Sequence, residues 1–257
     1  MPFGVMDAVL RRGPEAAVIA AGELGFDGVE VTLGRDYATN PVWSAEGRRA
    51  VKAAARAAGV EVPSVCLGVL NQGGFANDAA TRARARDLIK ETVEVAADLG
   101  AKVILVPFFG EGTIKDERGI EQTIEDAAAC APVAAAAGVV LGLETTLRAA
   151  ELRRIVGAVD SPAVRVYFDA GNAVWLGYDP AAEVRDLAGL IAQVHIKDTE
   201  RQPGDRMLGE GRVDFGAVAG ALREQGYQGY FVLETTAGGD PAWSARQNLA
   251  YIRQLLT

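Results

Sequence analysis

The sequence contains little histidine and cysteine, and this scarcity limits the chemistry that the protein can carry out. His195 is the single histidine among 257 residues, so any mechanism that needs several histidines is excluded. Cys66 and Cys130 are the two cysteines, and their separation matches no metal-binding spacing. So few cysteines indicate free thiols in a reducing compartment, and we therefore expect a cytoplasmic protein.

The chain also lacks a long uninterrupted hydrophobic run. Its longest apolar stretch, residues 127–143, is mostly alanine and is interrupted by Pro132 and Gly138. This stretch predicts a helix followed by a strand rather than a membrane span, so we expect no membrane partner. The first five residues contain no basic region followed by an apolar one, and we expect no signal peptide.

The chain also has fewer basic than acidic residues. The chain has 26 Lys and Arg residues against 34 Asp and Glu residues, which gives a net charge of −8. An acidic surface repels phosphate backbones, so we expect no nucleic-acid partner. The hydrophobic fraction of 49% and the charged fraction of 23% are typical of globular proteins and exclude a disordered or fibrous chain.

Short apolar runs alternate with longer, alanine-rich amphipathic stretches along the whole chain. The predicted strands cover residues 3–6, 28–32, 61–67, 103–108, 139–144, 166–169, 191–196 and 230–234. The predicted helices cover residues 15–24, 45–58, 79–99, 117–137, 147–158, 180–187, 215–225 and 241–255. This alternation predicts an α/β protein, a single (β/α)8 TIM-barrel domain over residues 1–257. A doubly wound sheet is disfavoured, because no Gly-x-Gly-x-x-Gly motif follows the first strand.

Four consecutive predicted strands each end in a side chain that can bind a metal ion. These side chains are Glu144, Asp169, His195 and Glu234. The C-terminal strand ends of a TIM barrel share one rim, where the chemistry takes place, so we expect the four to lie close together. Three carboxylates and one imidazole form a site rich in oxygen donors. Such a site favours Mn²⁺, with Mg²⁺, Co²⁺ and Zn²⁺ as alternatives.

Taken singly, these residues have ordinary structural explanations. Glu144 could be a solvated loop residue, Asp169 a turn residue and His195 a hydrogen-bonded core residue. Together they are harder to explain, because carboxylates crowded at one rim repel each other unless a cation neutralises them. The set as a whole therefore favours a metal site.

The segments around these residues resemble motifs of the sugar phosphate isomerase/epimerase superfamily, the xylose-isomerase-like TIM barrels. The matching segments are Leu143-Glu144-Thr145, Phe168-Asp169-Ala170-Gly171-Asn172, Val194-His195-Ile196-Lys197-Asp198 and Val232-Leu233-Glu234. Residues 24–30 and 209–215 also match the family pattern. The order and spacing of these motifs span nearly the whole chain. They are closest to L-ribulose-5-phosphate 3-epimerase and the ketose 3-epimerases.

The resemblance implies a role for each motif residue. By position, the metal ligands of the family correspond to Glu144, Asp169, His195 and Glu234. The two glutamates correspond to the acid and the base as well. Arg201, six residues after the histidine, corresponds to an arginine that binds substrate in the ketose 3-epimerases.

Two positions differ from the free-ketose epimerases. Asn172 stands where those enzymes have a histidine, and Ala150 stands where they have a glutamate. The Asp-x-Gly-Asn and His-x-Lys-Asp forms are more similar to the L-ribulose-5-phosphate 3-epimerase branch. Whether the sugar is phosphorylated stays open. Gly238-Gly239 could offer N–H groups to a phosphate, but Asp240 would compete with that anion.

The reaction implied by the resemblance is proton transfer at the carbon beside the carbonyl of a small ketose or ketose phosphate. It passes through an enediolate that a bound metal would stabilise. We predict Glu234 as the base and Glu144 as the acid in one direction, with the roles exchanged in the other.

Asn172, Lys197 and Glu30 are further candidates for substrate binding. Lys197 has the same strand parity as His195, so it could meet a phosphate or hydroxyl at the barrel mouth. It could equally pair with Asp198 or another carboxylate. Glu30, in the strand predicted over residues 28–32, could touch substrate, although we favour a pairing with a basic residue.

The same residues are compatible with other functions. A keto-inositol dehydratase or a lyase-type subunit would abstract the same kind of proton and then expel a leaving group. A non-catalytic sugar-binding barrel would not need all four ligands. An endonuclease of the related DNA-repair branch is disfavoured, because its metal cluster needs many histidines. From the family we also expect a homodimer or homotetramer that binds a small sugar or sugar phosphate.

Overall fold

Parallel strands close into a barrel in the computed structural model, which describes residues 1–235 and 237–256. Around this barrel the strands follow the order β1 (Phe3–Met6), β10 (Phe231–Leu233), β7 (Ile191–Ile196), β6 (Val164–Asp169), β5 (Val140–Glu144), β4 (Val103–Pro107), β3 (Ser64–Cys66) and β2 (Gly28–Thr32). Consecutive barrel strands pair in parallel, and β10 pairs with β7 and closes the barrel against β1. The predicted α/β fold, a (β/α)8 TIM barrel, is confirmed.

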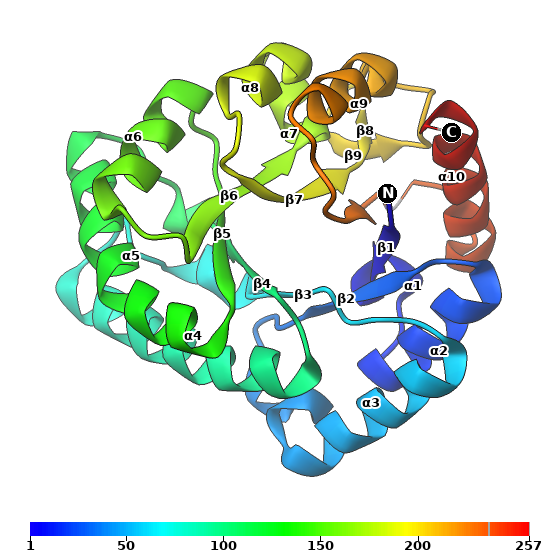
Figure 1. Cartoon of the computed structure of the whole chain (residues 1–257), viewed down its shortest axis with the longest axis horizontal. Helices are drawn as coiled ribbons and strands as arrows, with labels where there is room; N and C mark the ends of the chain where they lie inside the picture. Colours follow the sequence, from blue (N-terminus) through cyan, green and yellow to red (C-terminus); the bar gives the residue numbers. More distant parts are fainter. Residues whose placement is uncertain (236, 257) are drawn as a thin grey trace.

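Helices surround the barrel and connect its strands. They are α1 (Asp7–Leu10), α2 (Pro14–Leu24), α3 (Ala45–Ala58), α4 (Ala79–Leu99), α5 (Glu117–Ala137), α6 (Ala149–Val159), α7 (Ala170–Trp175), α8 (Pro180–Asp186), α9 (Phe215–Glu224) and α10 (Pro241–Leu256). Short 3₁₀ helices lie at Tyr37–Thr39, Pro41–Trp43, Gly68–Gln72 and Gly110–Gly112. Figure 1 shows the helical ring, which α10 closes between α9 and α2.

Most predicted elements appear within two residues of their expected ends. The strand expected over residues 61–67 is shorter, because Pro63 has no N–H group to donate to a neighbouring strand. The sequence pattern does not predict α1 or α7, which have four and six residues and are too short to show a helical period.

Capping residues define several helix ends. Asp179 and Asp214 accept hydrogen bonds from backbone N–H groups in the first turns of α8 and α9. Gly25 and Gly138 follow α2 and α5 with φ angles of 91° and 67°, a left-handed conformation that glycine adopts easily. The alanine-rich stretch forms the end of α5 and then β5, as expected. Within the described residues, no helix has the length and hydrophobicity needed to cross a membrane.

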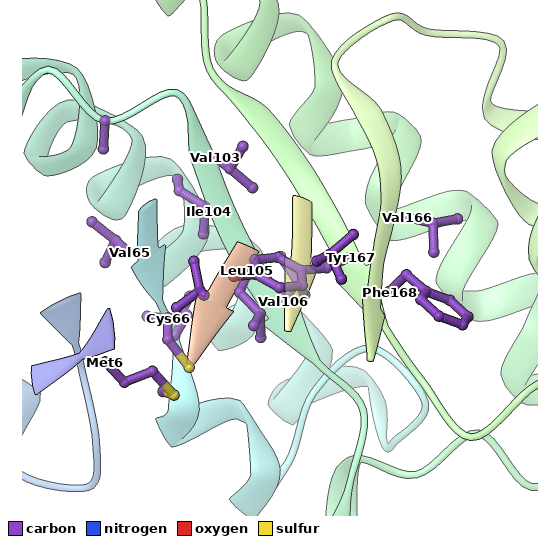
Figure 2. Close-up of a cluster of buried hydrophobic side chains, with 14 of the residues drawn as sticks. Met6, Val65, Cys66, Val103, Ile104, Leu105, Val106, Val166, Tyr167 and Phe168 are labelled. Atoms are coloured by element: carbon purple, nitrogen blue, oxygen red, sulfur yellow. The ribbon is translucent and has the colours of Figure 1, made fainter. Parts of the chain in front are cut away.

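Side chains along each strand alternate between the barrel interior and the surrounding helices. Val31, Ile104 and Leu141 are fully buried, and each such side chain contributes roughly 1.5–3 kcal/mol to stability. Figure 2 shows part of this buried hydrophobic cluster, with Met6 of β1 and Cys66 of β3 among its side chains. This apolar packing fixes the strands that carry the polar residues of the interior.

A two-stranded antiparallel hairpin follows β7. Its strands are β8 (Asp198–Thr199) and β9 (Pro203–Arg206), and the sequence analysis does not predict it. Asp198 is the first residue of β8. Its side chain is fully buried, and its carboxylate accepts hydrogen bonds from the backbone. The donors are the N–H groups of Thr199, Gly209, Gly211 and Val213, at N···O distances of 2.8–3.1 Å. One side chain thus holds both ends of the segment 199–213.

The Asp198→Asn variant should therefore be destabilised by roughly 3 kcal/mol, because an amide NH₂ cannot accept the two N–H groups that one carboxylate oxygen accepts now. Urea unfolding measures the change in the free energy of unfolding. Asp87→Asn, the same substitution at an exposed position of α4, serves as the control and should unfold like wild type. Equal unfolding curves for all three proteins would contradict the structural role of Asp198.

Candidate active site and metal centre

The four residues expected at the strand ends lie together at one rim of the barrel. Glu144, Asp169, His195 and Glu234 each offer one ligand atom, and these atoms all lie within 4.8 Å of one another. His195 Nδ1 is 2.9 Å from Glu234 Oε2, 3.8 Å from Asp169 Oδ2 and 3.9 Å from Glu144 Oε1. The first three side chains are almost completely buried, whereas the Glu234 side chain is 28% exposed. Glu234 thus forms the solvent-facing side of the cluster.

Asp169 has two different contacts through its two oxygens. Oδ1 accepts a hydrogen bond of 2.7 Å from the backbone N–H of Asn172 and so caps α7. Oδ2 faces the cluster, 3.0 Å from Lys197 Nζ. The sequence analysis weighed two explanations of Asp169, a turn residue and a member of the metal site. The side chain has both kinds of contact, one through each oxygen.

Lys197 lies inside the cluster. Its ammonium group is 2.6 Å from Glu234 Oε2 and 3.0 Å from Asp169 Oδ2, so its partners are carboxylates other than Asp198. Gly171 makes this position accessible, because a Cβ atom there would lie 2.5 Å from Lys197 Cγ. The glycine in the Asp-Ala-Gly-Asn motif is thus required by the close passage of the lysine.

Asn172 contacts the cluster from α7. Its Nδ2 donates a hydrogen bond of 2.9 Å to Glu144 Oε1. Both side chains are buried, and the amide gives Glu144 a neutral donor on the oxygen that lies 3.9 Å from His195 Nδ1. Asn172 therefore orients Glu144 in this structure, and its expected contact with substrate stays a prediction.

The environment shifts the pKa values of the carboxyl groups in opposite directions. Burial, with the nearby charge of Glu234, raises the pKa of Glu144 to about 8. Burial also raises the pKa of Asp169 to about 6, against the opposing effect of Lys197. Burial would raise the pKa of Glu234 too, but Lys197 and His195 hold it well below its usual range. One glutamate is thereby disposed to keep a proton and the other to lose it.

The residues present fit a divalent cation. Asp169 Oδ2 and His195 Nδ1 are buried, and their close neighbours are charged groups of the cluster: Lys197 Nζ lies 3.0 Å from Asp169 Oδ2, and Glu234 Oε2 lies 2.9 Å from His195 Nδ1. Three carboxyl groups packed this closely carry more negative charge than Lys197 alone offsets, and a divalent cation would balance it. Together with the two glutamates, Asp169 and His195 form a set of three carboxylates and one imidazole, a combination that suits hard and borderline divalent metals.

Beneath the cluster lies a polar network that the sequence analysis missed. Glu30 is completely buried and accepts hydrogen bonds from Ser64 Oγ at 2.6 Å and from Tyr167 OH at 2.7 Å. Its other oxygen is 2.9 Å from His195 Nε2, so Glu30 is paired with a basic residue and has no surface for substrate. Gln193 completes the network. Tyr167 and Gln193 each precede a predicted ligand by two residues. Side chains two residues apart on a strand face the same side, so this spacing could have placed both residues in the barrel interior beneath the cluster.

Two other expected features lie apart from the cluster. Arg201 is exposed in the turn of the hairpin, where its backbone N–H donates to Asp205 Oδ2. The structure does not bring its guanidinium into the cluster, and its substrate contact stays a prediction. Asp240 Oδ1 accepts a 2.7 Å hydrogen bond from the backbone N–H of Trp243, so this carboxylate occupies the start of α10, as expected.

A closed barrel with an acidic cluster and one histidine at its strand ends defines a TIM barrel with a candidate metal centre. The family model described as "Xylose isomerase-like TIM barrel" matches residues 18–255. The chain therefore belongs to the xylose isomerase-like TIM-barrel family, and the predicted superfamily is confirmed.

Related proteins cover nearly the whole chain. SgbU of Escherichia coli K12, provisionally named an L-ribulose-5-phosphate 3-epimerase, is 32% identical over 251 residues, which cover 90% of this chain and 87% of SgbU. The L-ribulose-5-phosphate 3-epimerase UlaE of the same organism is 28% identical over 266 residues, covering 94% and 90%. Among solved structures, the 3-keto-D-glucoside 4-epimerase YcjR from E. coli has a TM-score of 0.82 and 25% identity, covering 99% of both chains.

The raised pKa of Glu144 predicts how stability depends on pH in the protein stripped of metal. The group's pKa is about 8 in the folded protein against an ordinary value of 4.5. Its favourable contribution is therefore complete below about pH 4.5 and is lost as the pH rises toward 8. The Glu144→Gln variant should be more stable than wild type at pH 8, by an amount that shrinks toward pH 5.

Urea unfolding in EDTA at several pH values measures this difference. Glu23→Gln, the same substitution at an exposed position of α2, should show no such pH-dependent gain. A Glu144→Gln variant that is less stable than wild type at pH 8 would show that the ionised carboxylate is favourable in the fold.

Proposed function

We propose that the protein is a divalent-metal-dependent epimerase or isomerase of a small ketose or ketose phosphate. The observation that carries the proposal is the convergence of Glu144, Asp169, His195 and Glu234 within 4.8 Å at the strand ends of this barrel. A cluster with this composition suits a metal and a proton-transfer pair in one place.

The relatives support the class of reaction. SgbU, UlaE and YcjR are all named as epimerases, and the chain is an enzyme of this class. Their names include both a phosphorylated pentulose and an unphosphorylated keto-glucoside. We therefore propose L-ribulose 5-phosphate as the first substrate to test, followed by unphosphorylated ketoses and keto-glucosides.

We propose that the four clustered side chains hold the metal and that Mn²⁺ is the first ion to test. The donor set supports this choice, because three carboxylates favour a hard ion while one imidazole is also compatible with borderline metals. When bound there, the ion would supply Lewis acidity toward a substrate carbonyl and would offset the negative charge of its ligands.

The two glutamates would move the proton. Glu234 would take the proton from the carbon beside the carbonyl. Glu144 would return a proton to the opposite face of that carbon. In the metal-free protein their pKa values are shifted in opposite directions, and a cation held by both carboxylates lowers the pKa of each. In the reverse direction their roles are exchanged.

Neighbouring side chains would position the substrate. Lys197 Nζ lies 2.6 Å from Glu234 Oε2 and carries the positive charge closest to the proposed base, where negative charge develops on a substrate oxygen. Asn172 would orient Glu144 through its 2.9 Å hydrogen bond. We propose that Arg201 contacts the distal end of the substrate only if the hairpin turn moves toward the cluster.

We further propose that residues 1–257 form one domain and that the protein acts in the cytoplasm as a homodimer or homotetramer. The compartment is supported by Cys66 and Cys130, both of which are buried free thiols. Light scattering on the purified protein measures the oligomeric state.

Glu144→Gln and Glu234→Gln should each lower turnover by about 10³-fold or more, because each removes one partner of the proton transfer. The measurement is formation of product in D₂O, followed by NMR together with exchange of carbon-bound protons, with metal-loaded protein and a panel of ketoses and ketose phosphates. Glu23→Gln serves as the control and should retain the wild-type rate. A Glu144→Gln or Glu234→Gln variant with near-wild-type product formation and bound metal would contradict the assignment.

The same experiment distinguishes the alternative reactions. Exchange that yields an epimer or an aldose supports the proposal. Exchange with loss of water or of a substituent indicates a dehydratase or a lyase instead. Bound metal without exchange on any sugar that binds indicates a barrel that binds sugar without catalysis.

Saturating Mn²⁺ should raise the melting temperature of metal-free protein by about 5–10 °C, because an ion at 100 times its Kd stabilises the folded state by about 2.7 kcal/mol. Differential scanning calorimetry measures the shift. The Asp169→Asn variant keeps an oxygen that can cap α7 but loses a ligand oxygen, so its shift should be small. An equal shift in both proteins would place the metal elsewhere.

A further inference from the structure

The imidazole of His195 has two chemically different sides. Nδ1 faces the carboxylates of the cluster, whereas Nε2 points into the barrel, 2.9 Å from Glu30 Oε1. Glu30 comes from β2 and reaches across the barrel interior to the histidine on β7. The Tyr167 ring lies edge-on to the imidazole, with ring centroids 4.5 Å apart, and restricts the orientation of its plane.

The hydrogen bonds beneath Glu30 have a defined direction. Gln193 Nε2 donates to Ser64 Oγ at 2.6 Å and to Tyr167 OH at 2.9 Å. An amide NH₂ only donates, so both hydroxyls accept from Gln193 and must direct their own protons elsewhere. Both donate to Glu30 Oε2, at 2.6 Å and 2.7 Å. Glu30 Oε2 therefore accepts two hydrogen bonds, one from each hydroxyl group.

Glu30 consequently presents an acceptor to His195. With Oε2 occupied by two donors, Oε1 is the carboxylate oxygen left for Nε2, and the matching partner is an Nε2–H group. A neutral imidazole that carries its proton on Nε2 has a free lone pair on Nδ1. Nδ1 faces the oxygens of Glu144, Asp169 and Glu234 and is 2.9 Å from Glu234 Oε2, so a metal ion at the cluster would take this lone pair in place of the proton that Nδ1 otherwise shares with Glu234.

We propose that Glu30 is a positioning residue that fixes His195 in the Nε2–H tautomer and so makes Nδ1 the ligand atom of the metal centre. The inference rests on the metal binding in the proposed function, and it adds a role for a carboxylate that touches neither metal nor substrate. Space for this arrangement exists because β5 has Gly142 beside Tyr167, where a Cβ atom would lie 3.2 Å from the Tyr167 Cβ.

A glutamine at position 30 should reverse the tautomer. The two hydroxyls that now donate to Oε2 would bind the amide oxygen, which leaves the amide NH₂ group facing His195 Nε2. A donor facing that nitrogen favours an Nε2 lone pair and a proton on Nδ1, inside the cluster. The metal would then compete with this proton, so Glu30→Gln should weaken metal binding by about 10- to 100-fold.

The single histidine makes the test direct, because ¹⁵N-histidine labelling gives signals from one imidazole only. Zn²⁺ is the probe, since it is diamagnetic and leaves the imidazole signals visible by NMR. In zinc-loaded wild-type protein, we expect the proton on Nε2, slow exchange of that proton with D₂O, and a zinc-dependent shift of Nδ1. A proton on Nδ1, or a zinc-dependent shift of Nε2 as the ligand atom, would overturn the inference.

Calorimetric titration with Zn²⁺ compares the variants. Glu30→Gln should show the 10- to 100-fold loss. The matched control is Ser64→Ala, which removes one hydrogen bond to Glu30 but keeps the contact with His195, and it should retain most of the affinity. Equal affinities of wild type and Glu30→Gln would overturn the proposal. If Glu30→Gln does not fold, the tautomer in wild-type protein still decides it.

The outcomes separate this inference from the proposed function. Wild-type protein that binds no metal overturns both. Wild-type protein that binds zinc through Nε2 overturns the role of Glu30 and leaves the epimerase proposal standing. Zinc bound at Nδ1 in a protein that exchanges no sugar proton supports the role of Glu30 and counts against the epimerase.

Discussion

An excess of acceptors over donors at the barrel mouth is the constraint around which this structure is arranged. Three carboxyl groups and one imidazole converge there in a largely buried environment, where like charges repel strongly. Lys197 neutralises part of that charge from within the cluster, and Asn172 supplies a neutral donor. Local features that look unrelated follow from this need. Gly171 is small because the lysine must pass it, and Asp169 caps α7 with one oxygen while the other stays in the cluster.

Hydrogen bonds with a fixed direction in the barrel interior orient the His195 side chain at the barrel mouth. Gln193 donates to two hydroxyls, the hydroxyls donate to Glu30, and Glu30 accepts from His195. Every member of this chain is buried, so an unmatched donor or acceptor within it would be costly. The cluster at the rim is thus supported by these buried residues. Two of them, Tyr167 and Gln193, lie two residues before Asp169 and His195 on the same strands and fix the direction of the hydrogen bonds.

Much of this arrangement could be predicted from the sequence, because strand parity and strand ends are properties of the chain itself. The barrel, its helices and the convergence of Glu144, Asp169, His195 and Glu234 all follow from apolar periodicity and from what each strand ends with. The partners of Lys197 and Glu30 could not be predicted. Both sets of partners depend on which strands face each other across the barrel. They also depend on the close packing beside Gly171 and Gly142, where a Cβ atom would collide with a neighbour, and no spacing in the sequence encodes those distances. The β8–β9 hairpin was missed because main-chain donors, rather than a hydrophobic pattern, hold it in place.

The buried carboxylate of Asp198 ties the adjoining segment to the barrel at two points. Its contacts are with backbone N–H groups at residue 199 and at residues 209–213. Glycine is required at the second point, because a Cβ atom at Gly211 would lie 2.3 Å from Asp198 Oδ1 and Gly209 has a φ angle of 88°. Exposed residues between the two points, Arg201 among them, contribute no side chain to this anchor. Substitutions at those positions would therefore alter the surface of the loop while its ends stay where the carboxylate holds them.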